Sequence, residues 1–339
     1  MTPGSVLKIF YFSGTGNARQ VASWFSGLAI QRKTDCRLYN IAETDSKSVT
    51  VNAEDVILII SPIHGFYFPK ITMDFIRRFP EGKNQIVLMN TRGGLKIGRI
   101  VTPGLTGGAF MLSSLILRRK GYQIIGQIPF DMPSNWISIH PALRPKQVQY
   151  ILEKNRERVK KHFEKICAGK TDFQARKEIV QDILILPVSI AYYFAGKYFF
   201  AKSFYASSKC TRCNLCVAAC PAKAIKVVDQ RPYWTFKCQS CMKCMNLCPA
   251  RAIETTHGLW VAAIFASAIG ASLLYGLLPE TVHHWLVAFL IFNVLLIGLV
   301  VLIYNLQHRL LKNSIFAKII AMTSLTFYKF WGRYVMPQK

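Results

Sequence analysis

The sequence is poor in acidic residues. Its 339 residues contain 17 Asp and Glu against 43 Lys and Arg, which gives a formal net charge of +26 at pH 7. No recognition-helix or RNA-binding signature accompanies this charge, so nucleic acid is not expected as a partner. Basic residues beside apolar segments are drawn to the anionic lipids of a cytoplasmic membrane face, and they also speed encounter with acidic redox proteins. A merely basic, soluble surface is the plain alternative.

Two other signals are missing. The opening stretch MTPGSVLKIFYF lacks the basic region and the small-residue cleavage site of a signal peptide, and it is better interpreted as a strand. Neither a G-x-G-x-x-G fingerprint nor a Walker motif is present, so a nicotinamide nucleotide is not expected as the direct electron donor.

The ten cysteines are unevenly distributed. Eight of them lie in two short repeats between residues 210 and 248, whereas Cys36 and Cys167 stand alone and are expected to be ordinary thiols. Together with the missing signal peptide, this argues against a secreted disulfide framework. It favours a reducing, cytosolic setting for the cysteine-rich part.

The first 140 residues alternate strand and helix patterns. Apolar runs at 6–12, 56–60, 85–91 and 122–129 are typical of strands, and the second run is continuous, as in a strand buried on both faces. Helix-length segments separate the runs, which predicts βαβ units and a parallel α/β sheet.

A basic and then an apolar segment follow. Residues 143–170 show helical spacing of apolar residues and are predicted to form a connecting helix with a charged outer face. Residues 183–205 are apolar and aromatic, but Pro187, Gly196 and two lysines interrupt them. If this segment crossed a membrane, the cytosolic segments on its two sides would be separated, so an interfacial or re-entrant position is expected.

Two cleaner apolar runs predict a helical hairpin in a membrane. Residues 258–278 and 285–304 each approach the roughly 20 uncharged residues that cross a bilayer, and only the turn PETVHH separates them. Basic residues flank the pair on both outer sides, and the turn has none. The positive-inside rule therefore places both ends in the cytoplasm. Two buried helices of a soluble core are the alternative.

The two cysteine repeats have the spacing C-x2-C-x2-C-x3-C-P. Three closely spaced thiolates can hold three corners of a cubane, and the fourth ligates the cluster of the other repeat. On that geometry one 4Fe–4S cluster is bound by Cys210, Cys213, Cys216 and Cys248. The other is bound by Cys238, Cys241, Cys244 and Cys220. Zinc is the weaker alternative, because zinc sites usually pair two separate clips of ligands.

At these residues the sequence resembles a bacterial two-cluster ferredoxin, a small α+β domain. Ferredoxins of this kind are commonly acidic, but here basic residues surround the ligands: Lys209, Arg212, Lys223, Lys226, Lys237, Lys243 and Arg251. Cationic neighbours favour the more negative, reduced cluster and should raise its potential. They would also dock either an acidic ferredoxin or the phosphates of anionic lipids, and the sequence leaves both open.

The stretch YFSGTGNAR follows the first strand. A loop of Ser, Thr, Gly and Asn between a strand and a helix offers backbone N–H groups and hydroxyls to a phosphate. The loop resembles the FMN phosphate loop of flavodoxins, S/T-x-T-G-x-T, with Ser13, Thr15 and Gly16 in the matching positions. Ala18 stands where that loop has its last hydroxyl, and Asn17 is a candidate substitute. The FMN loop is thus predicted at Ser13, Gly14, Thr15, Gly16, Asn17 and Ala18.

Two further loops are expected to hold the flavin ring, since such a ring lies across the carboxyl ends of the central strands. They comprise Ser61, Pro62, Ile63, His64, Gly65, Phe66 and Tyr67 after the third strand, and Asn90, Thr91, Arg92, Gly93 and Gly94 after the fourth. Phe66, Tyr67 and Phe68 could stack on the ring or pack against the sheet, and Arg92 could steady negative charge on a reduced ring. His64 and Tyr67 are weak candidates for proton donors, and residues 133–136 are a further candidate contact.

Residues 6–256 together resemble flavodoxin–ferredoxin fusion proteins of bacteria and archaea, which are usually described only as electron carriers. The resemblance implies FMN and two 4Fe–4S clusters. The expected domains are a flavodoxin-like domain at 1–140, a linker at 141–207, the ferredoxin domain at 208–256, a transmembrane hairpin at 257–306 and a basic amphipathic tail at 307–339.

The leading hypothesis is a membrane-anchored electron-transfer flavoprotein of the cell inner membrane, with its redox domains facing the cytoplasm. Its partners would be an acidic ferredoxin or another electron donor, and a quinone or membrane oxidoreductase as acceptor. One alternative is a self-sufficient flavin-dependent reductase of a lipophilic substrate. Another is a non-catalytic iron–sulfur sensor or assembly subunit.

Overall fold

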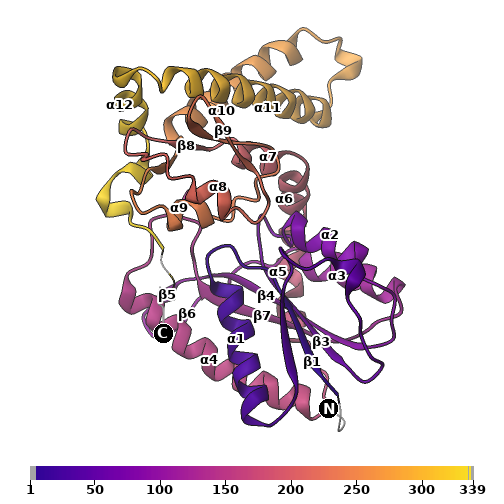
Figure 1. Ribbon diagram of the computed structural model, residues 1–339. Coiled ribbons are helices and arrows are strands. Elements are labelled where there is room, and N and C mark those ends of the chain that lie inside the picture. The colour runs from indigo at the N-terminus through magenta and orange to yellow at the C-terminus, as the bar shows by residue number, and fades with distance from the viewer. Residues whose placement is uncertain (1–4, 335, 337–339) are drawn as a thin grey trace. The chain divides into compact units, whose positions relative to one another are not determined.

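The computed structural model describes residues 5–334 and 336 (Figure 1). The chain forms two compact units. Within the described residues, the first unit comprises the segment up to Trp136, Ala142–Ile190, and the part from Tyr334 on. The second comprises Ile137–Pro141 and Ala191–Arg333.

The first unit is built on a five-stranded parallel sheet. Its strands are β1 (Leu7–Tyr11), β2 (Cys36–Asn40), β3 (Val56–Pro62), β4 (Gln85–Gly94) and β7 (Gln123–Pro133), in the order β2-β1-β3-β4-β7. This is the strand order of the flavodoxin-like doubly wound fold, with its switch point between β1 and β3. The predicted α/β class is confirmed.

Helices cover both faces of this sheet, as Figure 1 shows. Helices α1 (Asn17–Gln31) and α4 (Pro145–Cys167) share one apolar core with the sheet, and α2 (Lys70–Arg78) and α3 (Ala109–Arg119) share the other. Burial on both faces explains why the central strands are almost continuously apolar.

Helix α4 belongs to the first unit, although the flavodoxin-like domain predicted from the sequence ends at residue 140. Its apolar residues Val148, Ile151, Val159, Phe163 and Ile166 are all buried. An apolar stripe of this width needs a partner surface, and the sheet supplies it. The helix is therefore an integral layer of the fold, and its charged residues lie on the opposite face.

Shorter elements complete the first unit and the start of the second. They are η1 (Ser46–Ser48), β5 (Lys96–Ile97), β6 (Ile100–Val101), η2 (Gln174–Glu178), α5 (Ile179–Leu184), α6 (Leu186–Ala191), η3 (Tyr192–Gly196) and α7 (Lys197–Ala201). The segment 174–201 is thus divided among short helices, and it adds a third candidate membrane span only if it is counted as one bent span.

The second unit contains the cysteine module. Strand β8 (Phe204–Ala206) pairs antiparallel with β11 (Ile253–Thr255), and β9 (Ile225–Val228) forms a hairpin with β10 (Arg231–Trp234). Two one-turn helices, α8 (Leu215–Ala218) and α9 (Lys243–Leu247), each carry the third cysteine of a repeat. The module is α+β, as predicted.

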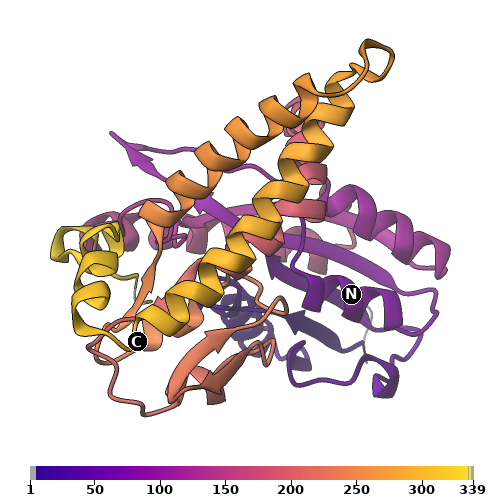
Figure 2. The same ribbon diagram turned by 90° about the horizontal axis from the view of Figure 1, so that it is seen from above.

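Two long helices follow the module and lie side by side, as Figure 2 shows. They are α10 (His257–Gly276) and α11 (Trp285–Leu310), joined by a turn that contains η4 (Glu280–Val282). Both are long and apolar enough to cross a membrane. Large apolar side chains such as Leu273 and Val294 are 67% and 69% exposed, which is compatible with a membrane. The shorter α12 (Ser314–Met322), η5 (Leu325–Phe327) and η6 (Lys329–Trp331) follow.

Candidate functional site

The predicted flavin loops meet at one edge of the first unit's sheet, because the carboxyl ends of parallel strands share an edge. Asn17 Nδ2 donates to the backbone oxygen of Pro133 at 2.9 Å, and Asn135 Nδ2 donates to Thr15 Oγ1. The backbone N–H of Ile63 donates to the oxygen of Thr91 at 3.0 Å. The loops after β1, β3, β4 and β7 are therefore bonded in pairs, β1 to β7 and β3 to β4.

The phosphate-loop prediction agrees with the local backbone. Ser13 Oγ accepts the N–H of Gly16 at 3.1 Å, and Gly16 has φ 110°, a left-handed value that favours glycine. The loop opens directly into α1, whose first turn has no acidic residue and whose N-terminal N–H groups attract an anion. Ala18 is 1% exposed and belongs to the apolar core, so its position contributes no polar group to the loop.

The side chain of Asn17 has a different task from the one predicted. Its Nδ2 binds Pro133, and its Oδ1 accepts from Tyr334 Oη at 2.7 Å. Both ends of the amide are thus bonded to protein, and the side chain fixes the loop to two distant segments instead of replacing a missing hydroxyl. Met336 lies beside the same loop, since a Cβ added at Gly16 would be 3.0 Å from its Cβ. Sequence reasoning missed both of these contacts.

The loop after β3 forms a tight turn. His64 and Tyr67 exchange two backbone hydrogen bonds of 2.9 and 3.3 Å, and Gly65 and Phe66 between them have φ values of 55° and 67°. Positive φ at both central residues is the geometry of a type I′ turn. His64, Phe66 and Tyr67 are half-buried at the strand-end edge, whereas Phe68 is buried in the core against Phe110. Of the two roles predicted for these aromatic residues, stacking on a flavin or packing against the sheet, Phe68 therefore has the second.

Polar atoms at the end of β4 support a bound polar ligand. Asn90 and Thr91 are 0% and 4% exposed, yet Asn90 Oδ1 and Thr91 Oγ1 have no hydrogen-bond partner in the described part of the chain. Buried polar atoms are normally satisfied, and such exceptions are common where a ligand binds. Ser61, by contrast, is paired with Thr72 Oγ1 at 2.8 Å. The polar groups of a flavin fit this edge.

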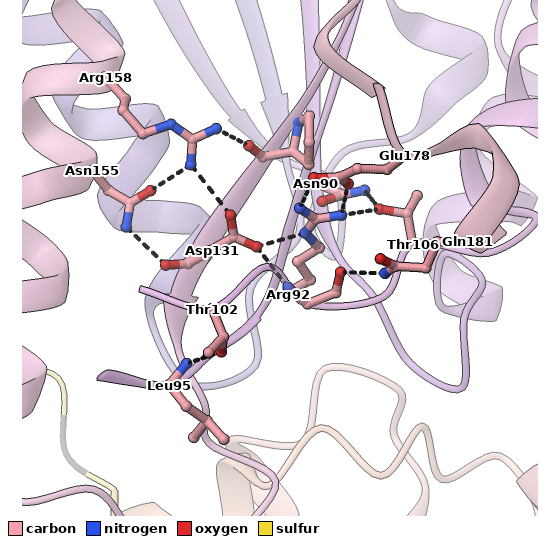
Figure 3. Close-up of polar contacts among 12 residues, drawn as sticks. Asn90, Arg92, Leu95, Thr102, Thr106, Asp131, Asn155, Arg158, Glu178 and Gln181 are labelled. Atoms are coloured by element: carbon pink, nitrogen blue, oxygen red, sulfur yellow. Dashed lines mark hydrogen bonds and ion pairs between the residues drawn. The ribbon is translucent and has the colours of Figure 1, made fainter. Parts of the chain in front are cut away.

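The guanidinium of Arg92 is bonded to carboxylates of the protein, whereas the sequence suggested that it could steady negative charge on a reduced flavin ring. Its Nε donates to Asp131 Oδ1 at 2.6 Å, and its two terminal nitrogens bind Glu178, with 2.8 Å between Nη2 and Oε1 (Figure 3). Nη1 also donates to Thr106 at 3.1 Å. The guanidinium is 1% exposed and is fully engaged by two carboxylates, so it fastens β4 to β7 and η2.

The glycines after Arg92 allow close approach of backbones at this edge. A Cβ at Gly93 would lie 2.8 Å from Ser134 Oγ, and one at Gly94 would lie 2.8 Å from the backbone oxygen of Asp131. Larger residues would separate the ends of β4 and β7.

The four cysteines predicted for the first cluster come together in the second unit. Cys210, Cys213, Cys216 and Cys248 line one cavity, with Arg212, Pro232 and Ile253 among its other walls. Burial raises the pKa of Cys216 to about 11, and the charges of Cys210 and Cys248 add to the rise. Cys213 is exposed, and the N–H of Leu215 lowers its pKa.

The four cysteines predicted for the second cluster also come together, in a more enclosed setting. Burial raises the pKa of Cys238 and Cys244 far above that of a free thiol, and it raises the pKa of Cys241 to about 11. Each of these three thiols also interacts electrostatically with Cys220. The ligand sets remain predictions, but the structure gathers the cysteines as those sets require.

The two repeats have the same backbone geometry around their last cysteine. The N–H of Ala224 donates to Cys220 Sγ at 3.3 Å, and the N–H of Ala252 donates to Cys248 Sγ at 3.3 Å. Lys223 and Arg251 both have φ 47°, a left-handed value that is unusual for long side chains. Strained backbone of this kind clusters where a ligand is bound, and N–H groups aimed at sulfur tune iron–sulfur clusters.

A single-ion site is not formed by these thiols. Within the described residues, no three His, Cys, Asp or Glu side chains lie close enough to hold one metal ion. Zinc bound by three or four of them would need such an arrangement. Thiols spread around a cavity are compatible with a larger, multi-iron group.

Comparison with known proteins agrees with the cysteine module. Residues 202–256 match the family described as a 4Fe-4S dicluster domain. This region is similar to that domain, and the predicted ferredoxin-type module is confirmed. Among curated proteins, no sequence matches this chain.

Solved flavodoxin structures are similar to part of the chain. A two-electron reduced flavodoxin of Megasphaera elsdenii is 17% identical, with a TM-score of 0.30; the match covers 44% of this chain and 98% of that one. A Streptococcus pneumoniae flavodoxin is 12% identical, with a TM-score of 0.31 and coverage of 44% and 94%. Rubredoxin:oxygen oxidoreductase of Desulfovibrio gigas is 10% identical, with a TM-score of 0.31 and coverage of 47% and 37%. The strand order, and not these likenesses, defines the fold.

Proposed function

We propose that the chain is a membrane-anchored electron-transfer protein with FMN at the strand ends of the first unit and two 4Fe–4S clusters in the cysteine module. The observation that carries the proposal is the grouping of eight cysteines into two sets of four, of which one set lines a single cavity. The match of the same region to a dicluster domain supports it.

The strand-end edge of the first unit supports FMN as the second cofactor. Ser13, Gly14, Thr15 and Gly16 form a loop at the N-terminus of α1, and such a loop binds phosphate through backbone N–H groups and hydroxyls. The unpartnered Asn90 Oδ1 and Thr91 Oγ1 supply polar partners at the strand end. Phe66 and Tyr67 are half-buried there and are suited to cover an aromatic ring.

When bound, FMN exchanges one or two electrons and each cluster exchanges one, so the pair connects two-electron with one-electron carriers. The residues of this chain bind and orient these groups. The turn at 64–67 and the bonded strand ends would hold FMN, and the thiols with the N–H groups of Ala224 and Ala252 would hold the two clusters. His64 and Tyr67 remain weak candidates for moving a proton at the flavin.

The helical hairpin is proposed to anchor the protein in the cell inner membrane. Arg251 lies before α10, Arg309 in the last turn of α11 and Lys312 after it. By the positive-inside rule these basic residues support a cytoplasmic position for both ends of the hairpin. Residues 174–201 would lie along or dip into the same face.

Labelling tests this topology: Glu280→Cys should react with an impermeant maleimide from outside intact cells, and Lys318→Cys should not. Labelling of Lys318→Cys alone would overturn the topology.

Anaerobic purification of the full chain tests the cofactors. Flavin absorbance together with iron–sulfur EPR signals is expected, and reduced ferredoxin should bleach both. In a matched variant, Ser13→Ala, FMN retention should fall while iron and sulfide stay unchanged. A colourless preparation without iron would exclude the proposal, and one with clusters but no flavin would favour the alternative of a sensor or assembly subunit.

The physiological partners are proposed from charge and location. A basic surface of net charge +26 favours an acidic electron donor such as a ferredoxin, and a hairpin in the bilayer favours a quinone or a membrane oxidoreductase as acceptor. Crosslinking in native membranes, followed by identification of the linked protein, tests this choice.

A further inference from the structure

Lys202 is a buried cation held between the cysteine module and helix α11. It follows α7, and its residue surface is 4% exposed. Its Nζ donates to the backbone oxygen of Trp234 at 2.7 Å and to Tyr233 Oη at 3.0 Å. The same atom lies 4.2, 4.5 and 4.8 Å from the ring centroids of Tyr233, Tyr304 and Phe236. Aromatic rings attract a cation, but they do not neutralise it.

Lys202 differs from the buried side chains of Lys8 and Arg92 in lacking a carboxylate partner. Lys8 is paired with Asp55 at 2.7 Å, and Arg92 is paired with two carboxylates. Lys202 forms no ion pair with Asp or Glu in the part of the chain that the structure describes. An isolated buried ammonium is costly, so a negative group is expected close by.

Lys202 lies against the segment that leads into the second set of cysteines: it binds the backbone oxygen of Trp234 and lies 4.8 Å from the ring of Phe236, two residues before Cys238. Burial lowers the pKa of Lys202 to about 8, and the charge of Cys238 opposes that fall. Burial raises the pKa of the Cys244 thiol, and the indole of Trp234, whose backbone oxygen binds Lys202, lowers it by a smaller amount. Lys202 therefore faces the site where four thiolates would hold an anionic cluster.

The first set of cysteines has a buried cation as well, but that cation is neutralised. Arg333 Nη2 donates to the backbone oxygen of Ile253, which lines the cavity of the first set, and to Glu254 Oε2 at 2.9 Å. Their side chains are 5% and 1% exposed. The two halves thus differ by one uncompensated positive charge.

We propose that Lys202 is the buried counter-charge of the second 4Fe–4S cluster and raises its reduction potential above that of the first. This inference rests on the proposed function, because it requires both clusters to be present. Net charge, hydrogen bonds and solvent exposure set the potential of a cluster within the range of its type, and a fixed positive charge stabilises the more negative reduced state. Electrons would therefore collect at the cluster beside α11.

Redox titration of the full-length holoprotein in detergent, followed by EPR, tests the proposal. The signal of the second cluster is identified as the one lost in Cys241→Ser. In Lys202→Met the ratio of reduced to oxidised second cluster at fixed potential should fall about tenfold, which corresponds to about 59 mV for one electron. The first cluster should titrate as before, and Lys202→Arg should restore the second.

An exposed lysine provides the matched control. Lys237 precedes Cys238 in the sequence but is exposed, so Lys237→Met removes the same charge from a screened position. Its effect on the second cluster should be clearly smaller than that of Lys202→Met.

Each outcome decides one question. Loss of the second cluster in Lys202→Met but not in Lys202→Arg supports the counter-charge, since the cluster then depends on it. Loss in both variants, an unchanged potential in Lys202→Met, or equal effects at positions 202 and 237 overturns the proposal. If the unmodified protein lacks clusters altogether, the proposed function fails, which is distinguishable from failure of the Lys202 inference.

Discussion

The two halves of the cysteine module share their spacing and backbone geometry, but they lie in different surroundings. In the first half Cys213 is exposed, and the N–H of Leu215 lowers its pKa. In the second half burial raises the pKa of Cys244 well above that of a free thiol. The buried cation beside the first half is paired with a carboxylate, whereas Lys202 beside the second is not.

The spacing of the cysteines and their surroundings therefore determine two different properties of the module. The repeated spacing determines which group is bound, because it positions four sulfur ligands. The surroundings determine how readily that group accepts an electron, because they fix charge, exposure and hydrogen bonding. A duplicated motif can therefore supply two electron carriers with unequal potentials, which gives electron flow a direction.

The largest expected effect comes from removing one ligand from each half. Cys213→Ser and Cys241→Ser should each lose about half of the iron and sulfide, since each cubane needs four ligands. Crossed ligation further predicts that Cys248→Ser abolishes the EPR signal lost in Cys213→Ser, and that Cys220→Ser abolishes the one lost in Cys241→Ser. Pairing of Cys248 with the second signal would show that each repeat holds its own cluster.

A smaller effect is expected from making the first half resemble the second. Glu254→Gln leaves Arg333 buried without its carboxylate, which should cost about 3 kcal/mol of stability. The newly uncompensated charge should also raise the potential of the first cluster toward that of the second. Thermal loss of cluster absorbance measures the first effect, and EPR redox titration measures the second. An unchanged potential would show that Arg333 does not act on that cluster.

A smaller change in the potential of the second cluster is expected from Trp234→Phe. Trp234→Phe removes the indole N–H that acts on Cys244 and keeps most of the buried ring. The reduced fraction of the second cluster at fixed potential should fall, but less than in Lys202→Met, because one dipole is lost instead of a full charge. A change as large as that of Lys202→Met would contradict this order.

The smallest effect is expected at an exposed ion pair of the same unit. Asp229 and Lys312 lie 3.0 Å apart, with side chains 43% and 59% exposed. Asp229→Asn should leave the thermal stability nearly unchanged and both potentials unaltered, because such pairs are weak and screened by salt. Thermal unfolding and EPR titration check this, and a strong effect would indicate that the hairpin β9–β10 depends on this contact.

The sequence was sufficient for the parts of the sites that are coded locally. The cysteine spacing and the short loop after β1 lie within single segments, and parallel strands necessarily bring their carboxyl ends to one edge. From these features the sequence predicted that Asn90 and Thr91 lie at the carboxyl edge of the sheet and that the thiols come together.

The rest depends on contacts between distant residues, which local patterns do not carry. Lys202 was visible only as an interruption of an apolar run, and its partner Tyr304 lies far along the chain. Arg92 looked available for a flavin, because its carboxylate Glu178 is 86 residues away. Helix α4 was assigned to a linker, since an amphipathic pattern shows that a helix packs but not against what.

The bond from Tyr334 to Asn17 joins residues 317 positions apart and ties the first loop of the fold to one of its last described residues. Because chains are made from the N-terminus, Asn17 leaves the ribosome long before this partner does. Both long apolar helices are synthesised in between. Final closure of that loop therefore comes late in biogenesis, after membrane insertion can begin, and a truncated product that stops before residue 334 would be recognisable by a loosened N-terminal domain.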